Sequence, residues 1–183
     1  MKALVVFGNG SEDSELVITV DILRRGGVDV TLASVDKMDV LLSHKLLIKA
    51  DTLFKKMSDK ECLEYDCLFI PGGKAAFTTL HNIPRLLDLV KEFYTNKKLV
   101  CAICAAPSIL GLAGILDNKN FTCYEGFQEY MKNGIYHPEL GAVKDQNIIT
   151  GRSMNYSIDF SLMVLEYLMG KDVALKVSKG ILR

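Results

Sequence analysis

The sequence lacks the features that proteins use to bind nucleic acids or to cross membranes. Its 22 Lys and Arg residues are balanced by 22 Asp and Glu residues, so the formal net charge at pH 7 is zero. No basic stripe or Lys/Arg cluster is present to neutralise phosphates. No apolar run approaches the roughly 20 residues that a membrane-spanning helix needs. We therefore expect neither nucleic acid nor a membrane among the partners.

An export signal is also missing, because Met1 leads almost directly into an apolar, strand-like segment. A cytoplasmic protein is the expectation, and its thiols are then reduced. The number of cysteines is odd, which also argues against a complete disulfide framework. The 183 residues, 49% of them hydrophobic, are enough for one globular domain, expected over residues 1–183. The five cysteines are Cys62, Cys67, Cys101, Cys104 and Cys123.

Common cofactor motifs are incomplete. Gly8-Asn9-Gly10 follows the first apolar segment, but Asp13 replaces the third glycine of a dinucleotide fingerprint, and the neighbouring acids would repel a pyrophosphate. Gly73-Lys74 is not a phosphate loop, because Leu68 and Ala75 replace its first glycine and its hydroxyl residue. A second C-x-x-C, typical of zinc sites, is absent. We expect no cofactor and no metal.

Strand-like and helix-like patterns alternate along the chain. The strand-like runs are solidly apolar instead of alternating, which indicates a parallel sheet covered on both faces. The first helix is expected to be capped by Ser11, with Glu12 and Asp13 solvated near its positive end. The sequence predicts a single-domain α/β fold with a doubly wound, mostly parallel sheet. Main strands are expected at 2–7, 28–34, 67–70 and 99–103, a hairpin near 40–49, weak strands near 121–124 and 147–150, and helices near 12–25, 75–80, 85–95, 107–113 and 157–169, with a shorter one beyond 171.

Cys104 stands where a buried strand turns into a helix. Small residues surround it, and Pro107 fits the first turn of the following helix. Such a turn resembles the strained elbow that presents a nucleophile in hydrolases. The helix start is expected to lower the pKa of the thiol, and the Ala105 N–H is expected to point toward an oxyanion beside the sulfur. The plain alternative is a cysteine buried in the core.

Cys101 forms a C-x-x-C sequence with Cys104 but is not expected to act with it. Cys101 lies inside the strand, and residues three apart on a strand point to opposite faces. A disulfide between the two would require the strand to unravel. We interpret Cys101 as an inert packing residue.

Two further segments are expected at the same edge of the sheet. Pro71-Gly72-Gly73 ends another buried strand, and glycine permits close approach of the backbone, which can supply a second N–H. Glu15 follows the first strand and lies on a helix face that is largely apolar. If it lies beside Cys104, the two groups titrate together, and a thiolate held by a protonated carboxylic acid is expected.

These residues together resemble the ThiJ/PfpI superfamily, and more closely its branch with the parkinsonism-associated protein deglycase and the bacterial ThiJ/YajL-like proteins. The resemblance covers essentially the whole chain: GSEDSELVITVDILRRGG at 10–27, YDCLFIPGG at 65–73, AICAAP at 102–107 and the helical region 157–171. It implies a flavodoxin-like fold of the class I glutamine amidotransferase type and a homodimer. It also implies that Cys104 is the nucleophile, Glu15 the protonated acid, Gly73 (with Gly72) and Ala105 the oxyanion pocket, and Arg152 a basic residue near that pocket.

The chain departs from this pattern at Tyr124, which stands where members with glyoxalase or deglycase activity usually have a histidine. Tyrosine is a poor base at neutral pH, and we expect Tyr124 to be part of the pocket wall. The loop after Arg152 is bulkier than the family's glycine- and proline-rich loop. Ala105 replaces the histidine that follows the nucleophile in protease members, which disfavours peptide hydrolysis.

Three functions fit these residues. The first is a cofactor-free enzyme in which Cys104 attacks methylglyoxal, glyoxal or their early adducts with amines and thiols while Glu15 moves a proton. The second is an oxidative-stress sensor or chaperone-like protein in which Cys104 is oxidised to a sulfinate. The third is an α/β binding domain with a vestigial thiol. An unusually apolar first helix is compatible with a subunit interface.

Overall fold

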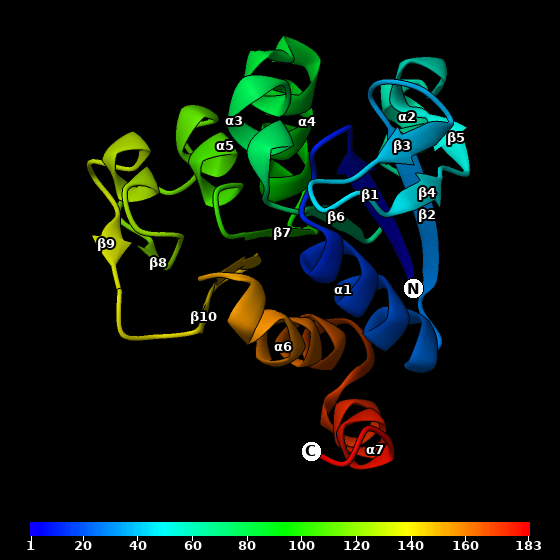
Figure 1. Ribbon diagram of the computed structural model, residues 1–183. Coiled ribbons are helices and arrows are strands. Elements are labelled where there is room, and N and C mark those ends of the chain that lie inside the picture. The colour runs from blue at the N-terminus through cyan, green and yellow to red at the C-terminus, as the bar shows by residue number, and fades with distance from the viewer.

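A seven-stranded sheet forms the centre of the molecule, which a computed structural model describes over residues 1–183 (Figure 1). The strand order is β10-β11-β7-β6-β1-β2-β5, and every pair is parallel except β10 with β11. This is the predicted doubly wound α/β fold. The strands of the sheet are β1 (Lys2–Phe7), β2 (Asp29–Ser34), β5 (Thr52–Leu53), β6 (Cys67–Ile70), β7 (Leu99–Ile103), β10 (Ala142–Asp145) and β11 (Ile148–Gly151).

The central strands are buried because helices cover both faces of the sheet. All residues of β6 and β7 are buried, and so are all of β1 except Lys2. A strand enclosed on both sides has no polar face, which explains the continuous apolar runs in the sequence. The helices are α1 (Asp13–Arg25), α2 (Asp59–Cys62), α3 (Lys74–Thr78), α4 (Pro84–Thr95), α5 (Pro107–Leu112), α6 (Ser157–Met169) and α7 (Lys171–Gly180).

Each face of the sheet has its own apolar core. On one face, Leu16 and Leu23 of α1 pack with Phe160 and Leu165 of α6 against the sheet. On the other face, side chains of α4 and α5 pack with Leu4, Leu68 and other sheet residues. Figure 1 shows α1, α6 and α7 on one side and α3, α4 and α5 on the other. The carboxyl ends of β1, β6 and β7 consequently meet at one edge, between these two layers.

Small elements fill the connections. The expected hairpin is present as β3 (Asp39–Leu41) paired antiparallel with β4 (Leu47–Lys49). The weak strand expected at 121–124 is instead the two-residue β8 (Asn120–Phe121), which pairs with β9 (Ile135–Tyr136) outside the main sheet. No helix is long and apolar enough to cross a membrane. Short 3-10 turns occupy Phe54–Lys56, Leu80–Asn82, Phe127–Tyr130 and Met154–Tyr156.

The cap of α1 differs from the expectation. Glu12, and not Ser11, is the N-cap residue, and its side chain accepts a hydrogen bond from the backbone N–H of Glu15 at 2.6 Å. The Ser11 hydroxyl instead accepts from the N–H of Gly8 at 3.1 Å, inside the preceding turn. Any side-chain oxygen that reaches the free N–H groups can cap a helix. Here the Glu12 carboxylate caps α1, and the Ser11 hydroxyl stabilises the turn that precedes it.

Candidate active site

Cys104 occupies a strained backbone position at the carboxyl end of β7. Its φ is +65°, in the left-handed region that costs an L-residue about 1–2 kcal/mol. The other non-glycine residues with positive φ lie in exposed turns, whereas Cys104 is only partly exposed. Two backbone hydrogen bonds hold the elbow: the Cys104 N–H donates to Gly151 O at 2.9 Å, and the Tyr124 N–H donates to Cys104 O at 2.8 Å. The expected elbow is therefore present.

Glu15 lies beside the thiol, in the first turn of α1. Its side chain is fully buried, with 0% exposure. One carboxyl oxygen, Oε2, accepts a hydrogen bond from the Gly72 N–H at 2.9 Å. The other, Oε1, is buried and accepts no hydrogen bond of ordinary geometry, while the carboxyl group as a whole interacts with the Cys104 thiol. The carboxyl group thus has one oxygen fixed by the backbone and one that is buried without a hydrogen-bond partner.

The two predicted backbone donors also reach the sulfur. The backbone N–H groups of Gly73 and Ala105 lie close enough to the Cys104 sulfur to act against the rise of its pKa. The Pro-Gly-Gly turn has to come close for this contact, and a Cβ on Gly72 would lie 2.6 Å from both Cys104 Cβ and Glu15 Oε2. Gly73 has a φ of +84°, and a Cβ there would lie 2.4 Å from Glu12 N. Only glycine fits either position.

Burial governs the protonation of this pair. Burial, and then the nearby charge of Glu12, raise the pKa of Glu15 to about 7. Burial, and then the Glu15 carboxylate, also raise the pKa of Cys104, against the smaller opposing effect of the two N–H donors. The first proton lost near neutral pH is therefore that of Glu15, and the thiol remains protonated.

The expected lowering of the thiol pKa is wrong for this geometry. The six-residue helix α5 begins at Pro107, and its start is outweighed by the apolar surroundings of the sulfur and by the carboxylate. A thiol facing a carboxylate that titrates near pH 7 is nonetheless a suitable arrangement for proton transfer, because the carboxylate can act as the base.

A cavity of about 400 Å³ opens over Cys104 and Glu15. As expected, Tyr124 is part of its wall, and Ser153 and Met154 of the bulky loop also line it. Arg152 is not among the lining residues but directly precedes one of them, Ser153, and its role near the pocket stays a prediction. Its charge acts near Tyr136 and Glu139.

His44 is a lining residue that the sequence did not reveal. It lies in the turn between β3 and β4, and this hairpin folds over the start of α1. The Asp13 carboxylate holds the turn by accepting hydrogen bonds from the N–H of His44 at 2.8 Å and of Leu46 at 3.2 Å. Asp13 is consequently buried and not solvated as expected. The other histidines are bonded elsewhere, His81 to Ser108 and His137 to Asn120.

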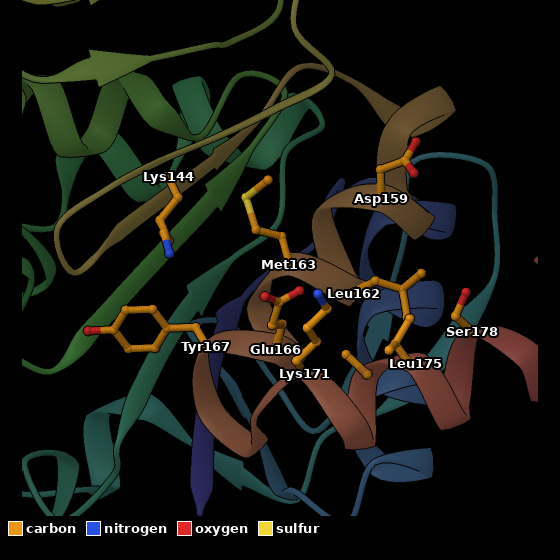
Figure 2. Close-up of a pocket in the computed structure, with 10 residues that line it drawn as sticks. Lys144, Asp159, Leu162, Met163, Glu166, Tyr167, Lys171, Leu175 and Ser178 are labelled. Carbon is orange, nitrogen blue, oxygen red and sulfur yellow. The ribbon is translucent and has the colours of Figure 1, made fainter.

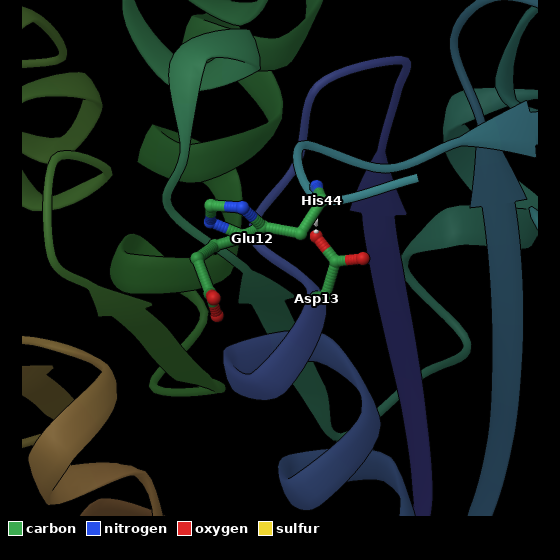
Figure 3. A group of neighbouring side chains, drawn as sticks. All are labelled: Glu12, Asp13 and His44. Atoms are coloured by element: carbon green, nitrogen blue, oxygen red, sulfur yellow. Dashed lines mark hydrogen bonds between the residues drawn. The ribbon is translucent and has the colours of Figure 1, made fainter. Parts of the chain in front are cut away.

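Glu12, Asp13 and His44 form a cluster whose potential metal-binding atoms all lie within 4.8 Å of one another (Figure 3). Both Asp13 oxygens already accept backbone N–H groups, and one Glu12 oxygen caps α1. These bonds explain the positions of both acids without a metal ion. We assign no metal to the cluster, and the expectation of a site without metal or cofactor remains a prediction.

Comparisons with known proteins identify the family of the chain. The family model described as DJ-1/PfpI matches residues 1–167. The chain belongs to the DJ-1/PfpI family. It is 34% identical to the Parkinson disease protein 7 homolog of Danio rerio over 179 residues, covering 96% of this chain and 94% of the relative. It is 36% identical to Protein DJ-1 homolog B of Arabidopsis thaliana over 179 residues, or 97% of this chain but only 40% of that longer protein.

Solved DJ-1 structures have the same fold. The crystal structure of Drosophila melanogaster DJ-1beta aligns with a TM-score of 0.92 and 31% identity, covering 99% of this chain and 97% of that chain. The predicted family and its flavodoxin-like fold are thereby confirmed.

The remaining thiols of this DJ-1/PfpI chain are buried. Cys67 and Cys101 pack with their sulfurs 3.8 Å apart, and burial raises the pKa of Cys101 well above that of a free thiol. Burial likewise raises the pKa of Cys62 and, to about 12, that of Cys123. All four are buried, as is typical of structural cysteines. Cys104 is the only cysteine that is not fully enclosed.

A larger hollow on the surface lies away from the thiol. It measures about 520 Å³ and lies between α6, α7 and the edge strand β10 (Figure 2). Lys144, Glu166 and Lys171 are among its lining residues, together with apolar side chains such as Leu175. It contains no cysteine or histidine and no buried unpaired side-chain atom. The smaller cavity over Cys104 is therefore the candidate active site.

Proposed function

We propose that the protein is a cysteine-dependent, cofactor-free enzyme for small carbonyl compounds, with methylglyoxal, glyoxal or their early adducts with amines and thiols as substrates. The observation that carries the proposal is the contact between the Cys104 thiol and a buried carboxyl group that titrates near pH 7. A base with a pKa close to the working pH is effective in proton transfer.

The first step is the addition of Cys104 to the aldehyde. The Glu15 carboxylate accepts the thiol proton while the sulfur bonds to the aldehyde carbon. The electron pair of the C=O bond moves to the oxygen, near the N–H groups of Gly73 and Ala105 that reach the sulfur. This oxygen then takes the proton back from Glu15, and the product is a hemithioacetal.

The second step moves a proton between carbons. Glu15 removes the proton from the carbon that carries sulfur and returns it to the adjacent carbonyl carbon, and the hydroxyl proton moves to the oxygen of that adjacent carbon. The hemithioacetal thereby becomes a 2-hydroxy thioester. Water then attacks the thioester, the Cys104 thiol leaves, and lactate or glycolate is released. No external oxidant or reductant is needed, because one carbon is oxidised as its neighbour is reduced.

The test is the formation of lactate from methylglyoxal by the pure protein. We expect lactate to form with the wild type and to fall to background in Cys104→Ser. A Cys67→Ser variant, which alters a buried thiol, is the control and should retain turnover. Equal lactate formation by wild type and Cys104→Ser would refute the proposal.

A second candidate is a sensor in which peroxide oxidises Cys104 through the sulfenic to the sulfinic acid. The favouring observation is Glu15 Oε1, which is buried without a partner and can carry a proton that bonds a sulfinate oxygen. In mass spectrometry after mild peroxide treatment, Cys104 should gain two oxygens before any other cysteine. Earlier oxidation of another cysteine would exclude this function.

We also propose that the chain acts in the cytoplasm as a homodimer. Apolar side chains are exposed side by side on α1 and the β3–β4 hairpin: Val17 is 40% exposed, Leu41 47% and Leu47 66%. Covering this surface with a second copy would remove them from water. Light scattering should give the mass of a dimer for the wild type and of a monomer for Leu47→Glu. A monomeric wild type would contradict the proposal.

A further inference from the structure

The cavity over Cys104 is unusually rich in acidic groups. Glu12, Asp13 and Glu15 all line it, whereas no Lys or Arg does. The basic residues next to lining residues along the chain, Lys45 beside His44 and Arg152 beside Ser153, lie outside the lining. His44 is the only lining side chain that can carry positive charge. The lining therefore carries three carboxyl groups and no permanent cation.

The charge of Glu12 reaches the reacting groups. It contributes to the raised pKa of Glu15, second only to burial. Glu12 is held in place because its Oε2 caps α1 by accepting the Glu15 N–H at 2.6 Å. Figure 3 shows Glu12 and Asp13 at the start of α1 with His44 beside them. The field that Glu15 experiences also acts on a charged substrate in the same cavity.

The fully buried Glu15 adds a second, independent observation. Its Oε1 has no partner, although the residue lines the cavity. A buried acceptor of this kind is satisfied when a donor enters, and N–H groups of ammonium or guanidinium type are strong donors to a carboxyl oxygen. An anionic ligand would bring further acceptors and leave Oε1 unsatisfied.

We propose that this cavity selects neutral or positively charged electrophiles and rejects anionic ones, and that Glu12 sets much of this preference. The preferred substrates are then uncharged dicarbonyls and the carbonyl adducts of amines or guanidines that keep a positive charge. Phosphorylated or carboxylated carbonyl compounds are disfavoured. This substrate class rests on the proposed carbonyl chemistry, but the charge preference itself belongs to the cavity.

The preference can be measured without turnover. Two methanethiosulfonate reagents of similar size, one with a trimethylammonium group and one with a sulfonate group, each convert the Cys104 thiol into a mixed disulfide and release methanesulfinate. The rate constants for Cys104 are measured by mass spectrometry and divided by those for a small free thiol in the same buffer. Cys104→Ser gives the background from the other cysteines.

We expect the ratio of the normalised rate constants, cationic reagent over anionic reagent, to exceed about ten at low ionic strength. Charges several ångströms apart in a partly screened site produce an effect of this size. The ratio should shrink as salt is raised to about 1 M, because the Debye length then falls to about 3 Å. Glu12→Gln keeps an oxygen that can cap α1 and removes the charge, and we expect it to lower the ratio at least about threefold.

Glu64→Gln is the matched control. Glu64 is exposed and precedes β6, at the opposite edge of the sheet from Cys104. This variant changes the net charge of the protein by the same amount and should leave the ratio unchanged. A wild-type ratio near or below one, or equal effects of Glu12→Gln and Glu64→Gln, would overturn the proposal. Charge selection without lactate formation would refute the enzymatic function alone.

Discussion

The protonation of the Cys104–Glu15 pair predicts an unusual pH dependence of thiol reactivity. In the wild type, the first proton leaves the pair near pH 7. Above that pH the pair shares a single proton. In most molecules the thiol carries this proton; in a small fraction, which does not change with pH, the carboxyl group carries it and the sulfur is a thiolate. The rate of alkylation of Cys104 by iodoacetamide should therefore rise up to about pH 7 and then reach a plateau.

Glu15→Gln should remove this plateau. The amide resembles the protonated acid in shape and in charge, so the thiol then titrates alone, with a pKa that burial still holds above the ordinary value of about 8.5. Its thiolate fraction rises tenfold for each pH unit below that value. The two proteins should react at similar rates near pH 6, and the variant should be about tenfold faster at pH 8.

Iodoacetamide kinetics between pH 5 and 9, followed on the peptide that contains Cys104, provide the assay. Glu64→Gln should keep the wild-type curve, because its charge is remote. The reasoning would be refuted if Glu15→Gln also levelled off near pH 7, or if it reacted more slowly than the wild type at pH 8. Either result would mean that the proton normally resides on Glu15 and that the sulfur is the stronger acid.

Three further predictions concern the same cavity. Gly72→Ala should reduce Cys104 alkylation and lower the free energy of unfolding by about 1–3 kcal/mol in denaturant titrations, because its Cβ would lie 2.6 Å from Cys104 Cβ and from Glu15 Oε2. An unchanged free energy of unfolding would contradict the close packing. Tyr124→His should raise the rate of lactate formation, since it adds a base to the cavity wall; a loss of activity with an intact fold would show that Tyr124 itself is required. As the pH rises from 4.5 to 7, the wild type should lose about 3 kcal/mol of unfolding free energy relative to Glu15→Gln. The reason is that a carboxyl group whose pKa rises on folding to about 7 stabilises the folded state only while it is protonated. If the unfolding free energies of the two proteins changed equally with pH, the raised pKa would be disproved.

The order of the layers could be predicted from the sequence, because it follows from local patterns. The uninterrupted apolar runs of β1, β6 and β7 require cover on both faces, and short loops between strand and helix give a parallel sheet. The edge strands β5 and β10 were not predicted as such. β5 has only two residues and β10 is partly exposed, so neither has an apolar run to detect.

The candidate site was predictable only where topology decides it. Cys104, Gly73 and Glu15 each follow a central parallel strand, so all three had to meet at one edge. His44 lies on a hairpin outside the main sheet, and its place in the cavity depends on the hydrogen bonds to Asp13. The thiol pKa was mispredicted for a related reason: the helix start is visible in the sequence, whereas the burial that outweighs it is a property of the assembled core.

The distribution of unfavourable features argues against a vestigial thiol. Across the whole chain, Glu15 Oε1 is the one buried side-chain nitrogen or oxygen without a partner. The only non-glycine residue that adopts a left-handed conformation away from an exposed turn is Cys104. Each costs about 1–3 kcal/mol, and they are in contact with each other. A domain that only needed to pack could relieve both with an alanine and an apolar side chain. The proposed roles of Cys104 as a nucleophile and of Glu15 as its proton acceptor account for the retention of both features.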